Sequence, residues 1–241
     1  MVYMNGKKTQ AENLIHGGKI PVFKILLLCV VSVAGNVLLN YLVNGVTRLP
    51  LYLDTVFTAA ICFTAGFIPG IITGILIPAL LVPFKYIFLF NYPLETSWPV
   101  YFFFICALGE IILICLFYKK IKPVENEFLK NLSEKKPFSQ SFIPLATQLL
   151  FLAAIACVLI SILGGIVGYT VGLLSMPRSL YPEDTFLLSL LRNDVPHLAS
   201  EILSRIPINT VDRFIVIFGG YGISLLFKKW LAAKKAPVQR I

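Results

Sequence analysis

Residues 51–90 read LYLDTVFTAAICFTAGFIPGIITGILIPALLVPFKYIFLF and contain only two charged side chains. A transmembrane helix needs about 20 consecutive apolar residues, so this stretch is long enough for two crossings. Pro69 and Gly70 divide it near the middle, and such a pair favours a tight reversal. The sequence therefore predicts a membrane-spanning hairpin, with one helix over 51–68 and the next over 71–90.

The composition of the whole chain also indicates a protein that lies in a lipid bilayer. Of its 241 residues, 57% are hydrophobic and 14% charged, and the mean hydropathy is +0.82. Four further apolar runs have the length of a crossing, and none alternates as barrel strands do. They cover roughly 21–42, 98–118, 142–176 and 208–227. The run 142–176 is longer than one crossing, so either Gly164-Gly165 kinks it or part of it lies outside the bilayer.

The basic residues indicate how the helices are oriented. The chain has 21 Lys and Arg against 12 Asp and Glu, a net charge of +9. Most of the basic residues fall in three segments, 7–24, 119–136 and 228–240, which an even number of crossings puts on one side. The positive-inside rule makes that side cytoplasmic. The sequence predicts an all-α, multi-pass protein of the cytoplasmic membrane, with six transmembrane helices and both termini inside. A nucleic-acid partner is not expected, because topology explains the basic surplus.

This topology divides the chain into a transmembrane domain and its flanks. We expect a cytoplasmic segment at 1–20, one six-helix domain at 21–227 with a cytoplasmic loop at 119–141 and an external loop at 177–207, and a basic tail at 228–241. Leucines recur at near-helical spacing within the external loop and are interrupted at Pro196, which predicts two short amphipathic helices. These helices either cover a site as a lid or only cover the ends of the spans.

Ionisable residues inside the spans are candidates for function, because they are costly in lipid and usually face the protein interior. There are five of them: Asp54, Lys85, Glu110, Asp212 and Arg213. In the predicted topology all except Glu110 share one layer near the external ends of their spans. The two Asp carboxylates would accept hydrogen bonds or hold a cationic group. Lys85 and Arg213 would bind a carboxylate or phosphate, or neutralise the acids.

Asparagines in the first span extend this polar layer. Ser32, Asn36, Asn40 and Asn44 recur every four residues, which places them along one helix face. An amide in hydrocarbon must find partners, so this face meets other helices or a solvated cavity.

Together these side chains predict a substrate pocket that opens to the outside. Its residues are Asn36, Asn40, Asp54, Thr58, Lys85, Asp212 and Arg213. In the alternative, Lys85 and Arg213 extend to the interface and the acids pair with them or cap helices. Glu110 lies near the middle of the fourth span, where it forms the pocket floor, relays protons or hydrogen-bonds a neighbour as a protonated acid.

Signatures of catalysis are missing from the sequence. It has no H-E-x-x-H zinc motif, no phosphate-binding loop, no nucleophile elbow and only two histidines. The five cysteines form no C-x-x-C pair. We therefore expect no enzyme, no metal site and no cofactor; the energy for moving a solute would come from an ion gradient or another subunit.

Two short stretches resemble a known family. Residues 49–58, LPLYLDTVFT, and 67–74, FIPGIITG, are similar to a pattern in the substrate-specific (S) components of energy-coupling factor transporters. The resemblance implies a subunit that captures a vitamin-like or other small solute from outside. It also implies a transmembrane coupling subunit and two cytoplasmic ATP-binding-cassette ATPases as partners. The alternatives are a ligand-sensing membrane module that signals through partners and, least favoured, a membrane enzyme that uses Glu110 as acid or base.

Overall fold

The computed structural model describes residues 21–47, 49–89, 98–134, 137–174 and 184–233, and every regular element in these ranges is a helix. The elements are α2 (Val22–Asn40), η1 (Tyr41–Val46), α3 (Val56–Ala65), α4 (Phe67–Leu89), η3 (Trp98–Phe103), α5 (Phe104–Ser133), α6 (Phe138–Leu174), α7 (Asp184–Arg192) and α8 (His197–Ala233). Four segments are long and apolar enough to cross a bilayer: Val22–Val43, Tyr101–Ser133, Phe142–Leu174 and His197–Ala232. The chain is an all-α, multi-pass membrane protein.

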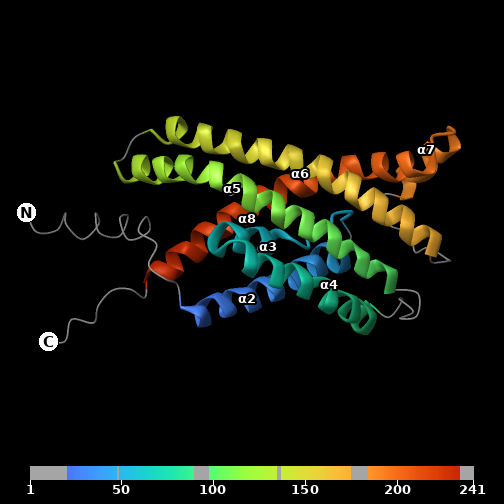
Figure 1. Cartoon of the computed structure of the whole chain (residues 1–241), viewed down its shortest axis with the longest axis horizontal. Coiled ribbons are helices and arrows are strands. Elements are labelled where there is room, and N and C mark those ends of the chain that lie inside the picture. Colours follow the sequence, from blue (N-terminus) through green and yellow to red (C-terminus); the bar gives the residue numbers. More distant parts are fainter. Residues whose placement is uncertain (1–20, 48, 90–97, 135–136, 175–183, 234–241) are drawn as a thin grey trace, which may run out of the picture.

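The helices form layers in which α8 is central (Figure 1). Helices α5 and α6 run antiparallel along one side, α8 packs against both α6 and α3, and α2 and α4 pack against α3. The largest apolar core lies where α3, α5, α6 and α8 meet. Its buried members include Phe63, Ile111, Ile114, Leu149, Val216 and Ile217. Polar side chains on α8 can therefore reach partners on both halves of the bundle.

Helix α8 begins earlier than the predicted sixth span. It runs for 37 residues through Pro207, so the second amphipathic helix expected in the 177–207 loop is the first part of α8. Proline within a helix removes one hydrogen bond, which packing against neighbouring helices can offset. The first amphipathic helix does form, as α7, and the chain breaks before Pro196, at the position that the leucine pattern indicated.

Helices α5 and α6 also extend beyond their predicted spans. The segment 119–141 was expected to be a loop, yet α5 continues to Ser133 and α6 begins at Phe138. Apolar side chains explain the difference, because Ile121 and Phe128 of α5 belong to the same buried core as Leu145 of α6. The 37 residues of α6 span about 55 Å, more than the roughly 30 Å hydrocarbon thickness, so α6 is long enough to extend beyond the hydrocarbon core.

The chain reverses direction at Gly66, earlier than the predicted reversal at Pro69-Gly70. Gly66 adopts φ = 88°, a conformation open to glycine, and separates α3 from α4. Pro69 and Gly70 instead fall in the first turn of α4, where a backbone N–H has no partner within the helix, so the N–H that proline lacks is not missed. Helix α3 has only ten residues, so the predicted span 51–68 is helical over part of its length. Residues 49–55 precede it without helical structure and are called the strap below.

Candidate functional site

Asp212 of α8 holds the strap against the bundle. Its Oδ1 accepts hydrogen bonds from the backbone N–H groups of Tyr52, at 3.0 Å, and Leu53, at 2.9 Å. From α2, the Nδ2 of Asn40 donates to the carbonyl oxygen of Tyr52 at 2.7 Å. Leu53 has φ = 42°, an uncommon conformation for a bulky residue. Buried backbone groups outside helices need other hydrogen-bond partners, and these two side chains supply them here.

Arg213 joins three parts of the chain at the same place. Its Nη2 pairs with Oδ2 of Asp212, and its Nη1 lies 2.6 Å from Oε2 of Glu110 on α5. Nη1 also donates a hydrogen bond to the Thr55 hydroxyl of the strap at 3.2 Å. The side chains of Asp212, Arg213 and Glu110 are 0%, 4% and 2% exposed. We call Thr55, Glu110, Asp212 and Arg213 the Arg213 cluster.

Asn36 connects the asparagine face of α2 to the start of α3. Its Nδ2 donates to the Thr58 hydroxyl at 3.0 Å, and its Oδ1 accepts from the backbone N–H of Phe57 at 2.8 Å. The first N–H groups of a helix have no partner within it, so this amide caps α3. Ser32 and Asn40 are buried on the same face. The four-residue spacing thus marks the face of α2 that packs inward.

The structure brings most of the predicted site residues close to the strap. Contacts through the strap and the start of α3 link Asn36, Asn40, Thr58, Glu110, Asp212 and Arg213. Asp54 is half-buried in the strap and interacts electrostatically with Arg213. Arg213 is buried in the bundle and does not extend to a surface, whereas the pairing of an acid with it, which the same alternative expected, is present. The side chains of Lys85 and Asn44 lie outside the described residues.

The chemistry of these buried groups is the basis for assigning a function. No family model, curated protein or solved structure matches this chain. The site offers carboxylate, guanidinium, amide and hydroxyl groups within a few ångströms, and such sets bind polar solutes through charge and hydrogen bonds. Among the described residues, no three His, Cys, Asp or Glu are placed to hold a metal ion.

Helix α8 carries buried polar residues that the sequence analysis assigned to the external loop. Glu201 and Arg205 are 0% and 3% exposed, and their side chains lie 3.6 Å apart. Arg205 also reaches the Tyr52 hydroxyl of the strap at 3.5 Å, and Asn209 donates to Ser161 of α6 at 3.0 Å. The sequence does contain a signal for this buried polar face, because polar residues recur there every four positions. His197, Glu201, Arg205, Asn209 and Arg213 form one stripe along α8.

Two glycines of α6 form the groove that holds Arg205. A Cβ built at Gly164 would lie 3.3 Å from the Arg205 side chain, and one at Gly168 would lie 2.9 Å from Oε2 of Glu201 and closer still to Arg205. On its other side the Arg205 guanidinium lies 5.4 Å from the ring centre of Phe103, within cation–π range. Glycines four residues apart let helices approach closely, and in this structure they accommodate a charged side chain.

A second charged cluster lies further along α5 and α8. Lys228 of α8 lies 2.5 Å from Oε1 of Glu125 and 2.8 Å from the Tyr118 hydroxyl, which donates to Oε2 of Glu125 at 2.7 Å. The ammonium group also faces the rings of Tyr118 and Tyr221 at 5.0 and 5.8 Å. We call these four residues the Lys228 cluster. Its single acid and single base each have several partners.

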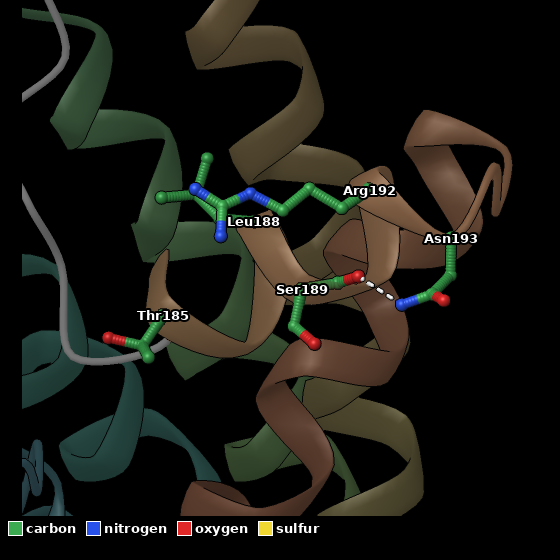
Figure 2. Close-up of a pocket in the computed structure, with 5 residues that line it drawn as sticks. All are labelled: Thr185, Leu188, Ser189, Arg192 and Asn193. Atoms are coloured by element: carbon green, nitrogen blue, oxygen red, sulfur yellow. Dashed lines mark hydrogen bonds between the residues drawn. The ribbon is translucent and has the colours of Figure 1, made fainter.

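A shallow surface pocket of about 400 Å³ lies on α7 and the turn that follows it. Figure 2 shows its lining residues, Thr185, Leu188, Ser189, Arg192 and Asn193. All five are exposed, and the one hydrogen bond drawn runs from the Asn193 amide to the carbonyl oxygen of Ser189 at 2.8 Å. This pocket shares no residue with the Arg213 cluster.

Proposed function

We propose that this chain is the membrane-embedded solute-binding subunit of an energy-coupling factor transporter. The observation that carries the proposal is the Arg213 cluster, in which three ionisable residues are at most 3% exposed within apolar helices. Ionisable groups at membrane depth are costly and typically mark the path of a solute or ion. The subunit takes up a small vitamin-like or other organic solute from outside, and partner ATPases drive its import.

The proposed topology has six crossings and places both termini in the cytoplasm. In addition to the four long segments, α4 has 23 residues, and the strap followed by α3 provides the remaining crossing. The clustering of lysines around the start of α2, around the α5–α6 connection and around the end of α8 supports this orientation. The Arg213 cluster then lies nearer the outside than the Lys228 cluster.

The strap is the part of this proposed site that a solute can replace. Its backbone is held by the Asp212 carboxylate and the Asn40 amide. A solute with N–H donors can take over the bonds to Asp212, while an acidic group on the solute can pair with Arg213. We propose that the described state is closed, and that solute binding displaces the strap.

Purification from native membranes tests the proposed partners. The tagged full-length chain should bring down a transmembrane coupling subunit and two ATPases, and vesicles containing the complex should take up solute only with ATP. A chain that transports alone would contradict the proposal. Recovery of a signalling protein in place of the ATPases would contradict it too and would favour the ligand-sensing alternative.

A further inference from the structure

The Arg213 cluster contains one more acid than base. Glu110 and Asp212 are the acids and Arg213 is the base, and all three side chains are at most 4% exposed. With both carboxyl groups ionised, the cluster would carry an uncompensated negative charge. An isolated charge in a medium of low dielectric constant is strongly disfavoured, so the surplus must be neutralised.

Asp212 has the partners that an ionised carboxylate requires. One oxygen accepts two backbone N–H groups from the strap, at 3.0 and 2.9 Å, and the other pairs with Arg213. Several donors directed at one carboxylate stabilise its charged form. The negative charge that balances Arg213 is therefore on Asp212.

Glu110 has far fewer partners. Its Oε2 lies 2.6 Å from Nη1 of Arg213, and within the described part of the chain no hydrogen bond reaches its Oε1. The Thr55 hydroxyl lies beside it, but a neutral hydroxyl does not replace a second cation. Glu110 is thus a buried carboxyl group that shares an already balanced arginine.

Among the described residues, the other titratable groups around Glu110 and Arg213 do not supply the missing positive charge. They are Asp54 of the strap, Cys62 of α3 and Cys106 of α5, together with Asp212 and Arg213 of α8. Thiols are neutral near pH 7 and Asp54 adds negative charge. Arg205 lies two turns away along α8 and pairs with Glu201.

We propose that Glu110 holds a proton, which makes the Arg213 cluster a proton-binding site with no net charge. Loss of this proton would create a second carboxylate that competes with Asp212 for Arg213. Because Asp212 also holds the strap, the charge on Glu110 controls how firmly the strap is bound. The inference does not depend on solute capture, since it concerns the protein alone.

Infrared spectroscopy of the full-length protein in lipid nanodiscs tests this assignment without any solute, with the spectrum of each variant subtracted from that of the wild type. At neutral pH the wild type should show the carbonyl-stretch band of a protonated carboxylic acid, and Glu110→Gln should lack it. Glu125→Gln is the matched control, because Glu125 is equally buried but paired with Lys228, and it should keep the band. A wild type without the band, or a band retained in Glu110→Gln, would overturn the proposal.

Thermal unfolding provides a second measurement. The unfolded chain exposes Glu110 as an ordinary carboxyl group, so above a pH of about 4.3 the wild type must take up a proton when it folds. Glutamine resembles the protonated acid without this cost, so Glu110→Gln should melt close to the wild type at about pH 4 and above it at neutral pH. As the pH rises, the wild type should melt progressively lower, whereas the variant should change less. If sodium ions stabilise the wild type and Glu110→Gln abolishes this stabilisation, a metal ion and not a proton neutralises the Arg213 cluster. This result would overturn the proposal.

Discussion

The Arg213 cluster and the Lys228 cluster are built from similar groups but differ in charge balance. In the Lys228 cluster one acid meets one base, both oxygens of Glu125 are bonded, and the Lys228 side chain is 18% exposed. In the Arg213 cluster two acids share one base, and Asp212 bonds to backbone outside the helices. A balanced pair needs nothing further, so it stabilises two helices. In our proposal, the cluster with the surplus acid is the one that responds to a proton or a solute, because it holds the strap.

Substitution of Asp212 should have the largest effect on this contrast. Asp212→Asn removes the charge that balances Arg213, so Glu110 must release its proton to replace that charge, and the neutral amide holds the strap less firmly. Removing one partner of a buried ion pair costs about 3–5 kcal/mol, and because Glu110 can take over the pairing we expect a loss at the lower end of this range in reversible unfolding in mild detergent. Val211→Ala is the control, because Val211 is 50% exposed on the same turn, and it should change little. Equal effects of the two substitutions would show that the cluster does not hold the strap.

Filling the glycine groove should have an intermediate effect. In Gly168→Ala the new methyl group meets Arg205 and Glu201, and such overpacking costs about 1–3 kcal/mol. Gly222→Ala is the matched control, because a Cβ there meets nothing within 4 Å, and alanine is the better helix former. Unfolding curves should show Gly168→Ala destabilised and Gly222→Ala unchanged or slightly stabilised. A Gly168→Ala variant as stable as the wild type would mean that Arg205 does not occupy the groove.

Breaking the Lys228 cluster should have the smallest effect. Lys228→Gln removes a charge that is partly exposed and leaves Glu125 bonded to Tyr118, so we expect a loss of about 1.5 kcal/mol. Solute uptake by the assembled transporter should remain normal in vesicles. Loss of uptake with full stability would show that the Lys228 cluster takes part in transport and would remove the contrast between the two clusters.

Periodicity and composition predicted the helical class, the polar face of α2 and most of the residues that meet near the strap. They did so because lipid-facing and inward-facing positions alternate with the helical repeat. The ends of the helices were harder to predict. An apolar run marks the hydrocarbon boundary and not the end of a helix, so α5 beyond Tyr118 was assigned to a loop and the start of α8 to a separate amphipathic helix.

The sequence also could not predict which groups the polar residues contact. Glu201 and Arg205 were placed outside the membrane because charged residues are usually exposed, whereas the glycines of α6 make room to bury Arg205. Asp212 bonds to a backbone N–H 160 residues away, and no local pattern specifies such a contact. Spacing identified the ionisable groups, but only their three-dimensional arrangement shows which acids share an arginine.

Mass spectrometry of small molecules that co-purify with the chain tests most directly whether the Arg213 cluster binds a solute. The wild type and Lys228→Gln, purified in parallel as folded protein, should carry the same bound solute. Arg213→Gln should lose it, and Arg213→Lys, which keeps the charge but not the planar fork, should carry less of it. Identical extracts from all four proteins would contradict the account, because the cluster would then be structural.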